Sequence, residues 1–147
     1  MSDLITAIAN NDLKTALALL ESGADPNEVA PINLSTPLHQ AAFIRNQNLA
    51  ELLLDAGANP NATNAGGYTP LHLAAGMVTM EMTRSMLDAG ADPSIVAKNG
   101  KTALDIATEY KAHENVALLK RVLLNDHVKA CPSTQDESPQ LGPRPKL

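Results

Sequence analysis

Two histidines in matching sequence surroundings are the first residues whose side chains could do chemistry. His39 ends the tetrapeptide TPLH at positions 36–39, and His72 ends the same tetrapeptide at 69–72. An imidazole can act as a general base or as a metal ligand near neutral pH. Either role needs further groups that converge on the same ring, whereas these two rings occupy equivalent slots 33 residues apart. We therefore interpret both histidines as structural.

Other patterns that would indicate an enzyme or a metal site are missing. The chain contains no HExxH, CxxC, Asp-x-Asp calcium loop, GxSxG or phosphate-binding GxxxxGK[ST] motif. Its one cysteine, Cys131, can form neither an internal disulfide nor a thiolate cluster. The glycine pair at 66–67 is better explained as a hairpin turn than as a phosphate loop. We expect no catalytic residue, no cofactor, no bound metal and no enzyme activity.

Composition and charge restrict the partners that the chain can have. The formal net charge of −5 argues against general nucleic-acid binding, which draws its affinity from Lys and Arg. The first residues lack a basic segment followed by a long apolar core, and no apolar run approaches membrane-spanning length. Together with the single cysteine, these features predict a cytoplasmic protein, with the nucleus also accessible. We expect a monomer whose partner is neither a nucleic acid nor a membrane.

An internal repeat must position these residues. The TPLH motif, with a degenerate TALD at 102–105, recurs every 33 residues, in phase with the Gly-Ala turns GADPN, GANPN and GADPS. In each unit a Thr can cap a helix whose first turn holds Pro, and a Gly can end a second helix in the left-handed conformation. The repeated motif positions are Thr36, Pro37, Leu38, His39 and Gly57 in one unit and Thr69, Pro70, Leu71, His72 and Gly90 in the next.

The combination of TPLH, an Ala pair, a Leu-Leu or Met-Leu pair and a Gly-Ala turn resembles the ankyrin repeat. The resemblance implies an all-α repeat solenoid of helix-turn-helix units with short β-hairpin fingers, in which no unit buries its apolar face alone. It also implies that the two histidines hydrogen-bond neighbouring loops. We divide the chain into an N-terminal capping repeat at 1–29, repeats at 30–62 and 63–95, a C-terminal capping repeat at 96–129 and a disordered proline-rich tail at 130–147.

Two places depart from the repeat. The finger at 27–36 is one residue longer than its later equivalents, and Leu34 stands where Gly67 and Gly100 stand later. Gly is usual at that position because the turn needs a positive φ, so we expect a wider, irregular first finger. In the last unit we expect one extra residue before His113.

The resemblance implies that a partner protein binds the concave face made by the finger tips and the exposed ends of the first helices. All three aromatic residues of the chain, Phe43, Tyr68 and Tyr110, are predicted on this face, and aromatic residues commonly anchor interfaces. Local packing of Phe43 and Tyr68 against their fingers is the alternative. Nearby lysines would suit a partner with an apolar anchor and an acidic flank. The predicted contact residues are Ile32, Asn33, Ser35, Phe43, Ile44, Ala65, Tyr68, Met77, Lys98, Asn99, Lys101 and Tyr110.

We therefore predict a non-enzymatic protein-interaction module that serves as an adaptor or an inhibitor. One alternative is a substrate of an asparagine-hydroxylating enzyme, which would modify Asn27 or Asn61 in the finger turns. Asp25 lies two residues before Asn27, as in the ankyrin sequences that such enzymes accept. The other alternative is a microbial ankyrin effector that binds a host protein.

Overall fold

The structure, a computed structural model, describes residues 3–77 and 80–130, with side chains as far as Asn125. Within these residues the chain forms eight α-helices in four consecutive pairs. The pairs are α1 (Asp3–Ala9) with α2 (Leu13–Glu21), α3 (Pro37–Phe43) with α4 (Gln47–Asp55), α5 (Pro70–Ala75) with α6 (Glu81–Asp88), and α7 (Ala103–Glu109) with α8 (His113–Ala130).

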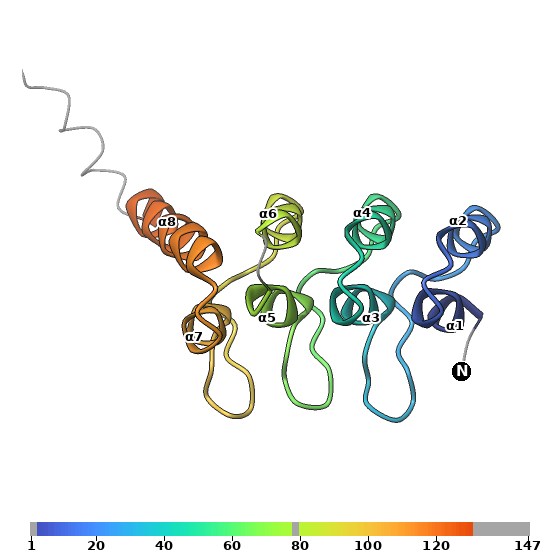
Figure 1. The fold of residues 1–147 in the computed structure, drawn as a ribbon, viewed down its shortest axis with the longest axis horizontal. Coiled ribbons are helices and arrows are strands. Elements are labelled where there is room, and N and C mark those ends of the chain that lie inside the picture. Colours follow the sequence, from blue (N-terminus) through green and yellow to red (C-terminus); the bar gives the residue numbers. More distant parts are fainter. Residues whose placement is uncertain (1–2, 78–79, 131–147) are drawn as a thin grey trace, which may run out of the picture.

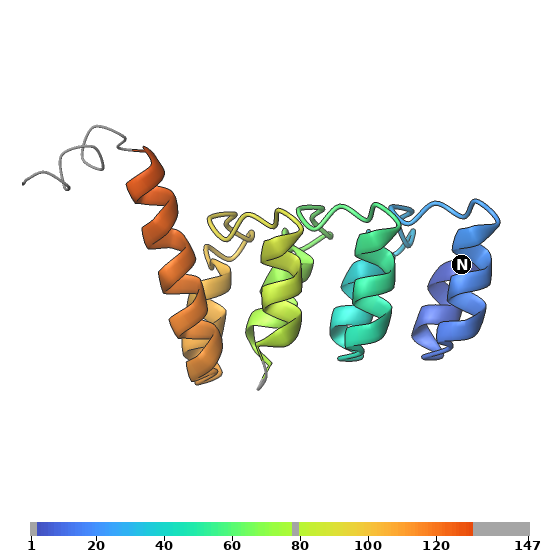
Figure 2. The same ribbon diagram turned by 90° about the horizontal axis from the view of Figure 1, so that it is seen from above.

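The four helix pairs stack side by side in two layers (Figure 1). The first helix of every pair lies in one layer, next to the loops that join successive pairs, and the second helix lies in the other layer (Figure 1). Seen from above, the pairs follow one another in chain order (Figure 2). Helices α1, α3, α5 and α7 contact one another along their row. This arrangement confirms the predicted all-α repeat solenoid.

Threonine caps begin the first helices of the last three pairs. The Thr36 hydroxyl accepts a hydrogen bond from the His39 backbone N–H, Pro37 fills the first turn, and the same arrangement recurs at Thr69. Pro suits this position because its missing N–H would have no partner in the first turn of a helix. In the degenerate TALD motif the Asp105 carboxylate replaces the imidazole and accepts from the Thr102 N–H at 2.9 Å. The cap therefore survives the loss of both Pro and His.

The core lies between the two layers and is built from small residues facing large ones. The alanines at 41, 42, 74 and 75 are fully buried, as are Leu53 and Met86 from the second layer. Small side chains let the helices approach closely, so the long residues opposite fill the remaining space. Gly57 and Gly90 end the second helices with φ of +97° and +99°, which confirms the predicted left-handed caps.

The position of α8 corrects the predicted insertion in the last unit. Leu49, Met82 and Asn115 are all buried and follow one another at the same interval of 33 residues, so no extra residue precedes His113. The equivalence of Asn115 to Leu49 and Met82 was not apparent in the sequence, because Asn115 is polar at a position that is apolar in the other two repeats. Its Nδ2 donates to the backbone carbonyls of Ala75 at 3.1 Å and Met77 at 2.9 Å, at the end of α5. These bonds satisfy carbonyls that a helix end leaves unpaired.

The fingers are turns and not paired strands. At the base of each finger one backbone N–H donates to a carbonyl across the turn, from Ala30 to Ser35 (2.9 Å), from Asn64 to Tyr68 (3.0 Å) and from Ala97 to Lys101 (2.9 Å). A second backbone bond lies inside each turn, from Leu34 to Ala30, from Gly67 to Asn64 and from Gly100 to Ala97. Because the chain reverses immediately beyond these bonds, no strand forms in the described residues. At the C-terminal end, helix α8 includes Ala130, which we had assigned to the tail, and residues 131–147 lie outside the described residues.

The first finger has the expected extra residue. Its closing bond spans five positions, from Ala30 to Ser35, where the second finger spans four. Leu34 adopts φ +57° at the place where Gly67 has φ +77°. The turn thus keeps a residue in the left-handed conformation although Leu replaces Gly. For a residue with a Cβ this conformation costs about 1–2 kcal/mol because of steric crowding.

Replacing Leu34 with Gly should therefore stabilise the protein. We expect Leu34→Gly to raise the free energy of unfolding by about 0.5–1 kcal/mol, because the relieved strain exceeds the added flexibility of the unfolded chain. Urea unfolding followed by circular dichroism measures the change. Val96, exposed in the third finger without a positive φ, is the matched control, and Val96→Gly should lower stability. A Leu34→Gly protein as destabilised as the Val96→Gly control would contradict the strain argument.

Candidate functional site

The two TPLH histidines hold neighbouring repeats together. The Nδ1 of His39 accepts from the Thr36 backbone N–H at 3.1 Å, and its Nε2 donates to the Tyr68 carbonyl of the next finger at 2.7 Å. His72 repeats the arrangement, and its Nε2 donates to the Lys101 carbonyl at 3.1 Å. Each ring is almost fully buried. The structural interpretation of both histidines fits these contacts, which fix where the second and third fingers stand.

Both imidazoles are neutral in this arrangement. Burial lowers the pKa of His39, and the hydrogen bond to the Tyr68 carbonyl offsets part of that shift. Burial lowers the pKa of His72 in the same way. An Nδ1 that accepts a backbone N–H cannot carry a proton, so the Nε2–H tautomer is the one that bridges the repeats.

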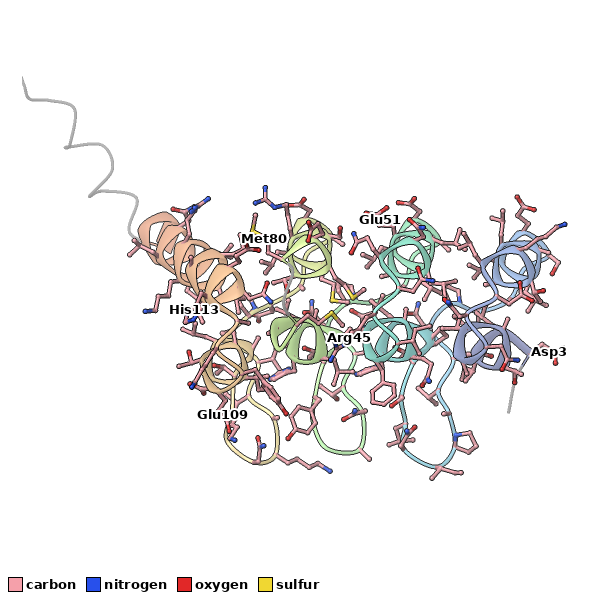
Figure 3. The ribbon with its side chains drawn as sticks, in the orientation of Figure 1. Asp3, Arg45, Glu51, Met80, Glu109 and His113 are labelled. Atoms are coloured by element: carbon pink, nitrogen blue, oxygen red, sulfur yellow. The ribbon has the colours of Figure 1, made fainter. Side chains whose placement is uncertain are left out.

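A groove of about 410 Å³ opens between the first-helix layer and the fingers. Its walls come from the ends of α3, α5 and α7 and from the second and third fingers. Figure 3 shows Arg45 after α3 and Glu109 on α7, whereas Glu51 and Met80 lie with the second-helix layer. The lining residues are Ala42, Phe43, Arg45, Tyr68, His72, Leu73, Gly76, Met77, Asn99, Lys101, Ile106, Glu109 and Tyr110.

Three aromatic residues line this groove, and they differ in how far they are exposed to solvent. Phe43 is 72% exposed and Tyr110 is 70% exposed, so both present their faces to solvent. Tyr68 is half-buried, with its ring edge-on to His72 at a centroid distance of 5.6 Å and its hydroxyl accepting from Asn99 Nδ2 at 2.6 Å. The high exposure of Phe43 disfavours the alternative in which it packs locally, whereas Tyr68 makes the local contacts that this alternative predicts.

Gly76 explains the position of Tyr110. Its φ of −81° is open to any residue, so the backbone does not require glycine here. A Cβ on Gly76 would lie 3.2 Å from the Tyr110 ring carbon Cδ2, closer than a comfortable contact. The missing side chain therefore makes room for the ring, which is seated against the end of the neighbouring helix.

Of the two cationic side chains that line the groove, those of Lys101 and Arg45, only that of Lys101 forms an ion pair among the described residues. Lys101 Nζ and Glu109 Oε2 form an ion pair at 2.5 Å, and this hydrogen bond raises the pKa of Lys101 above its usual value. Because both side chains are exposed, the pair contributes little to stability and mainly fixes the two groups in place. The Arg45 side chain also lines the groove, and among the described residues no ion pair or hydrogen bond engages its guanidinium.

Several predicted contact residues lie elsewhere than expected. Met77 is only 7% exposed because its side chain joins the core, and it forms the floor of the groove. Ile44 is half-buried against the same core. Both were predicted on the open face, but they pack into the hydrophobic core cluster that runs through all four repeats. Ile32 is 91% exposed in the first finger, beyond the groove lining.

The remaining predicted finger residues mainly connect the fingers. Ala65 N–H donates to the Asn33 carbonyl at 2.9 Å, and Lys98 N–H donates to the Gly66 carbonyl at 3.0 Å. Within its finger, Ser35 N–H donates to the Asn33 side chain at 3.0 Å. These bonds tie the three fingers into one wall, so their backbones have little freedom to move independently.

Seven lining residues are absent from the predicted contact residues, and one sequence signal could have found two of them, Leu73 and Ile106. The slot four residues after each Thr holds Gln40, Leu73 and Ile106, and it is apolar in the two repeats that build the groove. Ala42 belongs to the Ala pair of the repeat motif, and Arg45 lies in the turn between α3 and α4. Only the packed structure shows that both border the groove.

The asparagines predicted as modification sites bridge adjacent repeats. The Asn27 side chain donates to the Gly57 carbonyl at 3.2 Å and accepts from the Asn59 N–H at 2.6 Å. Asn61 makes the equivalent pair of bonds one repeat later, to the Gly90 carbonyl and the Asp92 N–H. Both ends of each amide are thus engaged, which favours a structural role for these side chains.

The described residues offer no other chemical centre. No group of three or more His, Cys, Asp or Glu side chains within them could hold a metal ion. In the same part of the chain, every helix is too short or too polar to cross a membrane.

Comparisons with known proteins agree with the repeat architecture. A sequence model of the family described as ankyrin repeats (3 copies) matches residues 4–97 and 38–128. The chain is 41% identical over 66 residues to the ARF GTPase-activating protein Git of Drosophila melanogaster, covering 45% of this chain and 9% of that protein. It is 50% identical over 54 residues to ankyrin repeat and SOCS box protein 16 of Mus musculus, covering 37% of this chain and 12% of that protein. The matched stretches are thus small parts of both relatives.

The bridging histidines predict how stability depends on pH. In the folded protein their pKa values are lowered, so below pH 6.5 the unfolded chain binds protons that the folded chain does not. Stability is therefore complete above that pH and falls as the pH drops from 6.5 through the folded pKa values, by at most about 1.4 kcal/mol per pH unit for each histidine. Urea unfolding between neutral pH and the onset of carboxylate titration measures this slope.

A single-histidine variant is the control for this prediction. His72→Gln should be less stable at every pH, because one bridge between repeats is weakened, but its pH slope in this window should be about half that of the unaltered protein. An unchanged slope in His72→Gln would show that other groups cause the pH dependence.

Proposed function

Because the chain belongs to the ankyrin-repeat family, whose repeats generally bind other proteins, we propose that it is a non-enzymatic interaction module with its partner protein in the groove. It would act as an adaptor or an inhibitor, as a monomer in the cytoplasm or the nucleus. The observation that carries the proposal is the pair of exposed rings, Phe43 and Tyr110, on the walls of one groove. The alternative of a microbial effector that binds a host protein would use the same groove. It differs only in that the partner protein comes from another organism.

The two rings are suited to anchor a partner because they are exposed and well positioned. Aromatic side chains bury much area on binding and lose little conformational freedom, since they have few rotatable bonds. Tyr110 is further restrained by its seat against Gly76. Restraint before binding lowers the entropy that association costs, so the partner meets a surface that is already arranged.

The extent of the surface favours a protein as the ligand. Ile32 in the first finger and Phe43 in the groove are both highly exposed apolar residues, and hydrogen bonds between fingers hold their tips in one wall. The groove alone, at about 410 Å³, is of a size that a small molecule could fill, but Ile32 extends the exposed apolar residues beyond the groove lining. The groove lining combines exposed aromatic residues with an arginine, residue types that are enriched at protein interfaces.

Removing the two exposed rings should abolish partner capture without unfolding the protein. We expect Phe43→Ala/Tyr110→Ala to bind a partner at least about tenfold more weakly, because central aromatic residues commonly contribute more than 1 kcal/mol each. Partners would be captured from cells, identified by mass spectrometry, produced in pure form and measured against both proteins by calorimetry. Circular dichroism and thermal unfolding would show that the double variant is folded.

Leu124 provides the matched control for this experiment. It is an exposed large apolar residue on α8, outside the groove lining, so Leu124→Ala should leave the affinity unchanged. If the double variant bound the purified partner as tightly as the unaltered protein, the groove would not be the binding site.

A further inference from the structure

The turns that follow the first helices contain an unusual choice of residue. Asn11, Arg45 and Lys111 have φ of +60°, +63° and +57°, and each donates its backbone N–H to a carbonyl in the helix before it. The left-handed conformation suits Gly and, next best, Asn. Asn11 shows that asparagine serves this turn, so the backbone geometry alone does not account for Arg45.

Two structural reasons for a cation at this turn need to be weighed. A positive charge near the C-terminal end of a helix is favourable, because unpaired carbonyls give that end a partial negative charge. This reason applies equally to Arg45 and Lys111. It does not explain why an arginine, with its planar fork of donors, stands at the turn that borders the groove.

Arg45 is also the uncommitted cation of the groove lining. The other cationic side chain in the lining is that of Lys101, and its ammonium forms an ion pair with Glu109 at 2.5 Å. Among the side chains that the structure describes, in residues 3–77 and 80–125, the Arg45 guanidinium has no such partner, and Arg45 lies two positions along the chain from Phe43. The groove therefore offers a free, fork-shaped donor close to its most exposed aromatic ring.

We propose that Arg45 determines specificity, and that the groove selects a polypeptide segment in which an Asp or Glu side chain lies beside an apolar anchor. The anchor packs on Phe43, and the carboxylate accepts hydrogen bonds from the guanidinium of Arg45. Such a paired, charge-assisted contact is geometrically specific and stronger than a contact between neutral groups. The inference rests on the proposed function, because it assumes that the groove is the binding site.

A phage-displayed library of random dodecapeptides, selected on the intact protein, is the probe that tests this inference. The enriched peptides should carry an acidic residue next to a bulky apolar one. Arg45→Asn keeps a residue suited to the left-handed turn and removes the charge, and it should bind these peptides about tenfold more weakly. Changing the acidic residue of a peptide to its amide should cost the same factor, and the two losses should not add.

Three further variants separate the possible explanations. Arg45→Lys keeps the charge but loses the fork, so its affinity should lie between those of the unaltered protein and Arg45→Asn. Arg84→Gln removes an exposed cation of α6, outside the groove, and should have no effect. The unfolding midpoint of Arg45→Asn should be no lower than that of the unaltered protein, because Asn fits the turn better.

The outcomes distinguish this inference from the proposed function. Enrichment of apolar peptides without acidic residues, lost in Phe43→Ala, would overturn the role of Arg45 and leave the groove as the binding site. Selected acidic peptides that bind Phe43→Ala undiminished would show that they bind elsewhere, which overturns both. Failure to enrich any peptide would also overturn the inference, because it holds that a short segment carries the recognised features.

Discussion

The imidazole of His39 connects two repeats, and the geometry of the groove depends on this connection. One nitrogen is held by the threonine cap of its own helix, and the other holds the Tyr68 carbonyl of the next finger. The ring can make both bonds only while it is buried and neutral. Tyr68 in turn contacts the next imidazole through its ring and the third finger through its hydroxyl. The wall of the groove is thus positioned by a relay of contacts that runs along the stack.

The groove changes in character along the stack. At the α3 end the groove is lined by the exposed ring of Phe43, and at the α7 end by the Lys101–Glu109 ion pair. Each repeat keeps the residues that hold the scaffold and varies those that line the groove, so scaffold and groove residues occupy different positions within the repeat. This separation lets the exposed residues change without loss of the cap, the core or the bridges between repeats.

The fold was predictable from the sequence because its signals are local. A threonine before a proline and a glycine after a helix act within a few residues, so motifs such as those at Thr36 and Gly57 indicate helix ends directly. The exposure of Ile44 and Met77 was not predictable, because it depends on how the neighbouring repeat packs. The register of α8 was also obscured, since the contacts that make Asn115 suitable at a buried slot come from a different repeat.

The bonds that Asn115 makes have a directional consequence for how the molecule comes apart. The amide belongs to the last repeat, yet it satisfies backbone carbonyls at the end of α5, in the repeat before it. If α8 detaches, the carbonyls at the end of α5 lose these hydrogen bonds, so fraying at the C-terminal end is coupled to loosening of the groove. The last repeat therefore stabilises one end of the groove, and local unfolding that begins at α8 would loosen the groove from that side.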